Sequence, residues 1–289
     1  MLAYVNTPNG AAAAELVEVD APTAAPNGVV IETRAFSLNR GELALLASRP
    51  QGWLPGQDIA GTVVRTTEDG SGPEMGSRVV ALVEGAGWAD LVAAPTDRVA
   101  TLPDSVSFAT AASLPIAGLT ALRTLRLGGS LLGRRVFITG ASGGVGNLAS
   151  QLARNAGASV SSASAVTDDV EGAFDLILES VGGRSLAAAI NHVAPGGVIV
   201  VFGNSSGEAT PVSLYDFVGR EGARLQTYFS YRSGMPEAVA ADLAVLVDQV
   251  ARGNLTPAIG FEGNWRELAM AINRLRERHI QGKAILHVG

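Results

Sequence analysis

The stretch Arg135-Val-Phe-Ile-Thr-Gly-Ala-Ser-Gly-Gly-Val-Gly-Asn-Leu-Ala-Ser-Gln-Leu-Ala-Arg154 decides the fold of this chain. Residues 136–139 are β-branched or aromatic and predict a buried strand, and the apolar residues from Leu148 onward follow the spacing of a helix. Residues 140–146, between them, predict a tight strand-to-helix turn. Glycines in such a turn let the backbone approach a pyrophosphate, to which the helix N-terminus offers unpaired N–H groups and a positive dipole.

The turn reads as a dinucleotide-binding fingerprint, Ala141-x-Gly143-x-x-Gly146, in which alanine replaces the first glycine. A glycine-rich motif alone is weak evidence, but this one follows a predicted strand and opens a predicted helix, which is the context that supports it. We therefore expect it to bind the phosphates of a dinucleotide. The alternative is a glycine-rich loop that binds nothing.

The composition limits the class of protein. The 289 residues suffice for two domains, and a hydrophobic content of 47% against 17% charged residues provides a sizeable core. The formal net charge of −6 argues against nucleic acid or an anionic membrane as partner, because both require clustered Lys and Arg. No apolar run approaches the ~18 residues of a membrane span.

The chain contains no cysteine, which excludes disulfides, a cysteine nucleophile and cysteine-based zinc sites. Its first residues, Met-Leu-Ala-Tyr-Val-Asn, lack the basic start and apolar core of a secretory signal. We therefore expect a cytoplasmic location.

The first region, residues 1–115, is predicted to be rich in strands. Pro and Gly separate its apolar runs at the spacing of a compact, barrel-like β domain. A short helix should follow Asn39, and a helix over residues 108–127 should break near Pro115. The expected strands are residues 29–36, 59–64 and 78–83.

The second region, residues 116–246, alternates strands and helices, which predicts a doubly wound parallel sheet. Residues 197–203 form a nearly continuous apolar run, as in a strand buried on both faces. The remaining residues, 247–289, form a C-terminal segment. The expected strands are residues 136–139, 158–162, 174–179, 197–203, 223–229 (an edge strand) and 283–288, and the expected helices are residues 184–191, 237–252 and 265–278.

Several motifs, in family order over nearly the whole length, resemble the medium-chain dehydrogenase/reductase superfamily. The most similar branch is the zinc-independent quinone oxidoreductases and related enoyl reductases. The resemblance implies a GroES-like catalytic domain, built from the N-terminal region and the tail, and a central Rossmann domain, with ligand in the cleft between them. The motifs are Ser37-Leu-Asn-Arg-Gly-Glu-Leu43, Pro55-Gly-Gln-Asp-Ile-Ala-Gly-Thr-Val63, Gly76-Ser-Arg-Val-Val-Ala-Leu82, Ala117-Gly-Leu-Thr-Ala-Leu122, Ala141-Ser-Gly-Gly-Val-Gly146, Glu179-Ser-Val-Gly-Gly183 and Gly282-Lys283.

The resemblance also implies site residues. Asn39 and Thr120 would line the nicotinamide and the substrate carbonyl. The alternative for Asn39 is a helix N-cap, and the alternative for Phe202 is a plain core residue. The residues implied to bind the cofactor are Ser142, Gly143, Gly144, Val145 and Gly146 at the pyrophosphate, Ser180 in its motif, and Phe202, Gly203, Asn204, Tyr228 and Phe229 around the nicotinamide.

No catalytic metal is expected. Zinc-dependent members of the superfamily place Cys and His ligands where this chain has Asn39 and Gln57, and they carry a cysteine-rich structural lobe that this sequence lacks. The three histidines are scattered and all lie late in the chain, at His192, His279 and His287. We interpret them as surface or packing residues.

The sequence departs from the family pattern after the second Rossmann strand. Only residues 163–173 precede the next strand, too few for the usual helix and strand, so the adenosine end of the site should be thinned or open. Around the end of the second strand there is also no Asp or Glu to bind the ribose hydroxyls and no Lys or Arg to pair with a 2′-phosphate. Ser161, Ser162 and Ser164 could bind either form. The family's usual preference and the missing Asp or Glu favour NADPH, with NADH possible. Asp168 and Asp169 lie beyond the strand and are interpreted as loop residues.

A second departure concerns the proton donor. Related reductases often carry a Tyr a little beyond the position of Asn39, but residues 45–53 contain none. The acid, if one is needed, would be water or Tyr231.

These observations predict an NADPH-dependent reductase that transfers hydride to a quinone or an activated double bond of a small-molecule substrate. The main alternative is a biosynthetic cyclase or isomerase that keeps the cleft but has lost hydride transfer. A non-catalytic binding homologue is a third interpretation. We also expect a homodimer, because residues 223–229 form an edge strand that can pair with its own copy.

Overall fold

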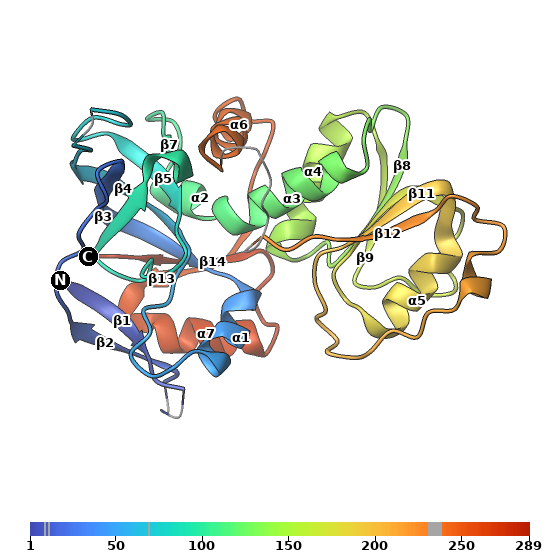
Figure 1. The fold of residues 1–289 in the computed structure, drawn as a ribbon, viewed down its shortest axis with the longest axis horizontal. Helices are drawn as coiled ribbons and strands as arrows, with labels where there is room; N and C mark the ends of the chain where they lie inside the picture. The colour runs from blue at the N-terminus through green and yellow to red at the C-terminus, as the bar shows by residue number, and fades with distance from the viewer. Residues whose placement is uncertain (9, 11, 69, 231–238) are drawn as a thin grey trace. The chain divides into compact units, whose positions relative to one another are not determined.

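The computed structural model describes residues 1–8, 10, 12–68, 70–230 and 239–289 (Figure 1). Internal contacts divide the chain into two compact units. Unit 1 is Met1–Leu119 with Met235–Gly289, and unit 2 is Thr120–Gly234. Unit 1 contains a mostly antiparallel sheet and unit 2 a parallel one. The predicted α/β fold class, with its two kinds of sheet, is confirmed.

The main sheet of unit 1 joins the two ends of the sequence. Its strand order is β13-β14-β3-β4-β5-β7, with β6 paired to β3. Because Ala284 of β14 lies opposite Leu38 of β3, the register brings Lys283 close to Asn39. The strands are β3 (Gly28–Leu38), β4 (Asp58–Arg65), β5 (Arg78–Leu82), β6 (Leu91–Pro95), β7 (Val99–Thr101), β13 (Ile259–Asn264) and β14 (Lys283–His287), and β1 (Leu2–Asn6) and β2 (Ala14–Glu18) form a separate pair.

Apolar side chains of these strands form one core. Phe36 and Trp88 stack with ring centroids 6.0 Å apart, and both are buried. The predicted break near Pro115 is confirmed, because α2 ends at Ala112 and α3 begins at Pro115. The helices of this part of the chain are α1 (Arg40–Ser48), η1 (Thr96–Arg98), α2 (Phe108–Ala112), α6 (Val239–Ala251), η3 (Trp265–Glu267) and α7 (Leu268–Arg276), and α3 (Pro115–Leu127) runs from one unit into the other.

The sheet of unit 2 has the strand order β12-β11-β10-β8-β9, and all its neighbouring strands are parallel. Phe137, Ile177 and Ile199 pack with Ala189 and Ile190 of α5 in its core. The elements are β8 (Arg135–Thr139), α4 (Gly144–Asn155), β9 (Ser159–Ala163), β10 (Phe174–Glu179), α5 (Gly183–His192), β11 (Val193–Val201), η2 (Leu214–Phe217) and β12 (Arg224–Thr227).

The predicted shortening of this sheet is confirmed. Residues 164–173, all of them described, contain neither helix nor strand, so β9 ends the sheet on one side. On the other side β12 is the edge strand, as predicted, but it ends at Thr227, so Tyr228 and Phe229 follow it. The strand predicted over 197–203 begins earlier, at Val193, and ends at Val201.

The predicted domain limits, after residues 115 and 246, stay predictions. The boundaries between the compact units lie after Leu119 and after Gly234. The second boundary lies before the predicted one because α6 contacts β5, η1 and β7, all of which belong to unit 1. Across the described ranges, no helix combines the length and apolarity needed to cross a bilayer.

Candidate functional site

The glycine-rich turn in unit 2 has the geometry that the fingerprint predicts. Gly143 is the N-cap of α4, and its N–H donates to the carbonyl of Gly140 at 2.9 Å. Gly140 has φ of +64°, a conformation that favours glycine. A Cβ on Gly146 would lie 2.4 Å from the Gly140 carbonyl oxygen, so no side chain fits there. The first turn of α4 leaves N–H groups without helical partners, and the turn therefore fits a pyrophosphate.

The ends of three parallel strands are joined beside this turn. The N–H of Ser180, after β10, donates to Oγ1 of Thr139, the last residue of β8, at 2.8 Å. The N–H of Ser205, after β11, donates to the carbonyl of Ser180 at 3.0 Å. Ligands of open parallel sheets bind outside these carboxyl ends. The predicted cofactor residues that meet at this edge are Ser142, Gly143, Gly144, Val145, Gly146, Ser180, Phe202, Gly203 and Asn204.

Ser161 and Ser162 lie on β9, opposite Phe137 and Ile138 of β8, and both are exposed. The N–H of Gly140 donates to the carbonyl of Ser164 at 3.3 Å. The serines therefore stand beside the turn, at the open edge of the sheet, where the adenosine end of a dinucleotide was predicted.

Beyond β12, Tyr228 is buried and its N–H donates to the carbonyl of Val201 at 2.9 Å. Phe229 is largely exposed. Tyr231, the predicted acid, lies outside the described residues. The roles predicted for these side chains stay predictions.

Sequence reasoning missed one buried connection in unit 2. Oε2 of Glu179 accepts from the N–H of Gly182 at 2.8 Å, and Oε1 accepts from Oγ of Ser185 at 2.8 Å. Oγ of Ser185 in turn accepts from the N–H of Val166 at 2.9 Å. Burial raises the pKa of Glu179, and these hydrogen bonds oppose the rise. The connection fixes the loop that replaces the missing helix and strand.

In unit 1, Asn39 belongs to a buried polar group that we call the Asp58 cluster: Ser37, Asn39, Asp58 and Lys283. Oδ2 of Asp58 accepts from Ser37 Oγ at 2.7 Å, from Asn39 Nδ2 at 2.8 Å and from Lys283 Nζ at 3.1 Å. Lys283 Nζ also donates to Asn39 Oδ1 at 2.5 Å. Asn39 does precede α1, as the N-cap alternative predicts, but its side chain is held by the cluster.

Glu42 adjoins the cluster and is buried. Its Oε2 accepts from the N–H of Asn39 at 2.7 Å. Burial, and then the charge of Asp58, raises the pKa of Glu42 to about 8, so the carboxyl is protonated at neutral pH. Oε1 of Glu42 and Oε1 of Gln57 have no hydrogen-bond partner within the described part of the chain.

Sequence reasoning assigned no role to Lys283, Asp58 or Glu42, although all three stand in the motifs quoted above. The sequence did contain a signal for them: an ionisable residue inside an apolar strand or helix needs a partner when it is buried. Thr120, the other predicted catalytic residue, lies buried in α3, and its carbonyl accepts from Oγ1 of Thr124 at 2.6 Å.

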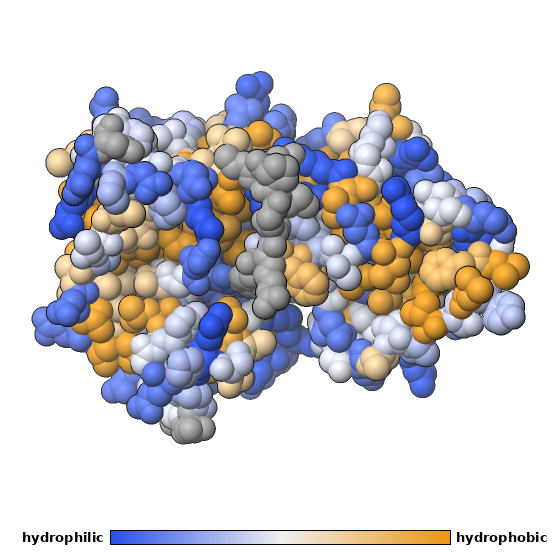
Figure 2. Space-filling model, viewed as in Figure 1, coloured by the Kyte–Doolittle hydropathy of each residue, from blue (hydrophilic) through white to orange (hydrophobic). Residues whose placement is uncertain are grey.

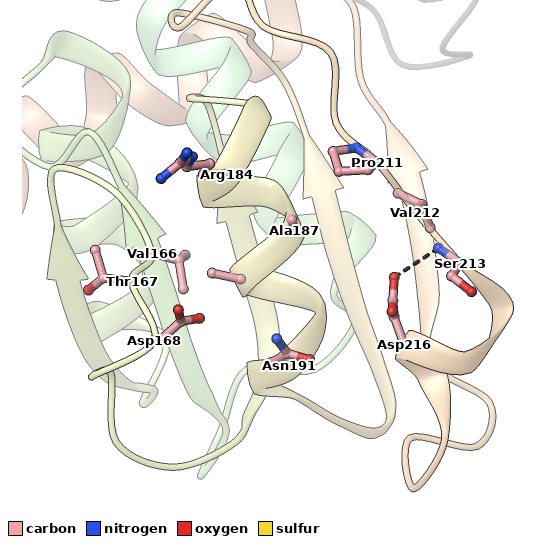
Figure 3. A pocket seen from close by; sticks show the side chains of 11 residues that line it. Val166, Thr167, Asp168, Arg184, Ala187, Asn191, Pro211, Val212, Ser213 and Asp216 are labelled. Atoms are coloured by element: carbon pink, nitrogen blue, oxygen red, sulfur yellow. Dashed lines mark hydrogen bonds between the residues drawn. The ribbon is translucent and has the colours of Figure 1, made fainter.

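A cavity of about 640 Å³ in unit 2 was not predicted (Figure 3). It lies along α5, between the loop after β9 and the segment after β11. Its polar lining includes Asp168, Arg184, Asn191, Ser213 and Asp216, and Oδ2 of Asp216 accepts from the N–H of Ser213 at 2.8 Å. Among the residues that the structure describes, no group of three or more His, Asp or Glu side chains could hold a metal ion.

Comparisons with known proteins agree with this architecture. A family model described as zinc-binding dehydrogenase matches residues 157–286. The chloroplast envelope quinone oxidoreductase homolog of Arabidopsis thaliana is 35% identical over 175 residues, which cover 55% of this chain and 53% of that protein. The chain thus spans about half the length of this relative, and 6% of a Streptomyces venezuelae polyketide synthase component that is 33% identical over 62% of the chain.

Solved structures share the fold. The Escherichia coli quinone oxidoreductase complexed with NADPH aligns with a TM-score of 0.87 at 20% identity, over 99% of this chain and 100% of that one. The quinone oxidoreductase of Coxiella burnetii aligns with a TM-score of 0.84 at 23% identity, over 100% of this chain and 99% of that one. Together with the glycine-rich turn and the shared strand edge, these similarities support the medium-chain dehydrogenase/reductase superfamily, in its quinone oxidoreductase branch, and the solved structures show that the chain has the same fold.

Proposed function

We propose that this chain is a reductase that uses NADPH and no zinc to transfer hydride to a quinone or to the activated double bond of an α,β-unsaturated carbonyl compound. One observation carries the proposal. The glycine-rich turn is intact at the strand edge, where Gly146 has no room for a Cβ and Gly143 caps α4. The similarity to quinone oxidoreductases, one of them solved in complex with NADPH, supports the same cofactor class.

The chemistry divides between cofactor and protein. NADPH supplies the hydride when it is bound. The chain's own part is to hold the acceptor against it and exclude water. Asn39 and Thr120 would donate hydrogen bonds to the oxygen on which negative charge develops. Tyr231, or water, would supply the proton.

Independence of zinc is supported by the residues at the ligand positions. Neither Asn39 nor Gln57 offers the thiolate or imidazole that zinc prefers. Both ends of the Asn39 carboxamide are already engaged, by Lys283 and Asp58. Hydrogen-bond donors would therefore take the place of a Lewis acid.

The preference for NADPH over NADH is proposed to be modest, about 10-fold, because neutral serine hydroxyls bind a phosphate more weakly than a guanidinium does. Arg154 is one candidate for such a guanidinium, although it lies in the last turn of α4, roughly 15 Å along the helix from the glycine-rich turn. Arg184, in the first turn of α5, is a second candidate, because it lines a cavity together with Val166–Asp168 of the loop after β9. A preference above about a thousandfold would mean that one of these arginines reaches the 2′-phosphate.

We also propose a homodimer formed through β12. All its residues are exposed at the edge of the sheet. In the segment before it, Val212, Leu214, Tyr215 and Val218 are exposed as well, and Figure 2 shows apolar surface over this part of unit 2. An exposed edge strand beside apolar side chains suits pairing with a second copy.

A cyclase or isomerase without hydride transfer is the second candidate, and the open loop 164–173 favours it, because that loop thins the adenosine end. Titration of the purified protein with NADPH separates the two. Micromolar binding supports the reductase, whereas no binding even at millimolar NADPH contradicts it and favours the second candidate. Turnover without cofactor would then separate a cyclase from a non-catalytic homologue.

A further inference from the structure

The Asp58 cluster has one member with a larger exposed fraction than the others. Ser37 and Asp58 are fully buried, Lys283 is 4% exposed and Asn39 is 8% exposed. Asn39 is therefore the member of the cluster most accessible to a group outside it.

The partners of Asn39 fix which way its carboxamide points. An ammonium group only donates hydrogen bonds and a carboxylate only accepts them. Oδ1 of Asn39 must therefore face Lys283, at 2.5 Å, and Nδ2 must face Asp58, at 2.8 Å. The reverse arrangement would set donor against donor and acceptor against acceptor. One Nδ2 hydrogen remains after these bonds are made.

Asp58 is itself held by four donors. Its Oδ2 accepts from Ser37, Asn39 and Lys283, and its Oδ1 accepts from the N–H of Ile116 at 2.9 Å. A fully buried carboxylate persists only with such compensation. The anchor for Asn39 is therefore rigid, and rotation of the carboxamide would break two charge-assisted hydrogen bonds.

We propose that Lys283 is a positioning residue: by holding Oδ1 of Asn39 it leaves the second Nδ2 hydrogen as the group that Asn39 offers to the substrate. This inference rests on the proposed function. A donor suits an oxygen that gains negative charge, such as the carbonyl oxygen of a quinone or an enone. It does not suit a hydroxyl group that must lose its proton. The cluster therefore favours reduction of a carbonyl-conjugated acceptor over oxidation of an alcohol.

Removal of the ammonium should free Asn39 to rotate. Lys283→Met is expected to lower kcat with benzoquinone about 10- to 100-fold, less than the loss of an oxyanion donor itself. The KM for NADPH should stay unchanged, because the phosphate turn belongs to unit 2. Lys283→Arg keeps a cationic donor and should recover part of the rate.

Two further variants test whether a loss of kcat comes from misfolding or from the removal of any cation. Lys283→Met leaves the buried Asp58 carboxylate without its cationic partner. Asp58→Asn/Lys283→Met, in which neither residue is charged, is therefore the second variant, and thermal melting checks that it folds. Arg252→Met is the matched control. It removes an exposed cation, paired with Asp248 at 2.8 Å, and should keep the wild-type kcat.

The deciding experiment is a double-mutant cycle of Asn39→Ala and Lys283→Met, measured with NADPH and benzoquinone. If Lys283 acts through Asn39, Lys283→Met causes no further loss of kcat in the Asn39→Ala background. Additive losses, or a folded Lys283 variant with wild-type kcat, would overturn the inference. Wild-type protein that reduces neither benzoquinone nor an enone would instead overturn the proposed function, and the inference with it.

Discussion

Ser185 and Glu179 are joined by a hydrogen bond between two buried side chains, Ser185 Oγ donating to Glu179 Oε1 at 2.8 Å. Because Ser185 Oγ also accepts from the N–H of Val166, it connects the end of β10 to the loop that follows β9. This loop lies where the family resemblance predicts a helix and a strand. One serine hydroxyl thus supports the part of unit 2 in which the adenosine end of the cofactor is proposed to bind.

Ser185→Ala should therefore destabilise the protein. It leaves the buried N–H of Val166 without its acceptor and removes one donor from Glu179, which costs about 1–3 kcal/mol of unfolding free energy. Urea denaturation measures the change. Ser48→Ala, at an exposed position, is the control and should alter stability by less than about 0.5 kcal/mol. Equal effects of the two variants would show that the connection contributes nothing.

Gly143→Glu should abolish NADPH binding. A Cβ at this position would lie 3.2 Å from the carbonyl oxygen of Gly140, and the carboxylate would occupy and repel the proposed pyrophosphate position. Ala156→Glu adds the same charge at the other, exposed end of α4 and should bind NADPH like wild type. Calorimetric titration compares the two. Undiminished binding by folded Gly143→Glu would move the phosphate site elsewhere.

Glu42 should make stability depend on pH. Burial and the charge of Asp58 raise its pKa from 4.5 to about 8 in the folded protein, against the partial opposition of Lys283. The folded state then holds a proton that the unfolded chain releases at a lower pH. The free energy of unfolding should fall as pH rises from 4.5 to about 8, by at most about 1.4 kcal/mol per pH unit from this group.

Glu42→Gln, a neutral replacement of the same shape, should remove this part of the pH dependence and be more stable than wild type above pH 8. Denaturant unfolding across the window measures both slopes. Glu171→Gln, at an exposed position, serves as the control. Identical slopes for wild type and Glu42→Gln would contradict the assignment.

Proline at the outer edge of β12 should weaken the proposed dimer. The N–H of Tyr228 points to Val201 of β11, and successive N–H groups of a strand alternate in direction, so those of Leu225 and Thr227 point away from β11. Thr227→Pro therefore removes an outward donor, whereas Gln226→Pro would break the sheet itself. Light scattering should show a wild-type dimer at micromolar concentration and a more dissociated Thr227→Pro. A wild-type monomer would refute the dimer, and a dimer unaffected by Leu225→Pro and Thr227→Pro would place the interface elsewhere.

Local signals in the sequence predicted much of unit 2. The glycine spacing of residues 140–146 is a property of one short segment, and strand and helix patterns on both sides of it could be read directly. The missing helix and strand followed from counting residues 163–173. The edge position of β12 followed from the order of the crossovers.

The Asp58 cluster could not be predicted in the same way. Lys283 meets Asn39 across 244 positions of sequence and Asp58 across 225, and only the pairing of β14 with β3 brings them together. The cavity along α5 likewise depends on how two loops pack beside one helix. The motifs include the segments that form the cluster, but the periodicity of apolar residues does not indicate which buried charged side chains pair with each other.

Turnover of NADPH by metal-free protein tests the central claim most directly. Protein dialysed against EDTA is mixed with NADPH and either benzoquinone or an α,β-unsaturated ketone, and the loss of NADPH is followed with and without added zinc. The account predicts steady oxidation of NADPH at the same rate in both arms, with reduced acceptor formed in equal amount. No oxidation above the protein-free rate, or activity that appears only when zinc is restored, would contradict it.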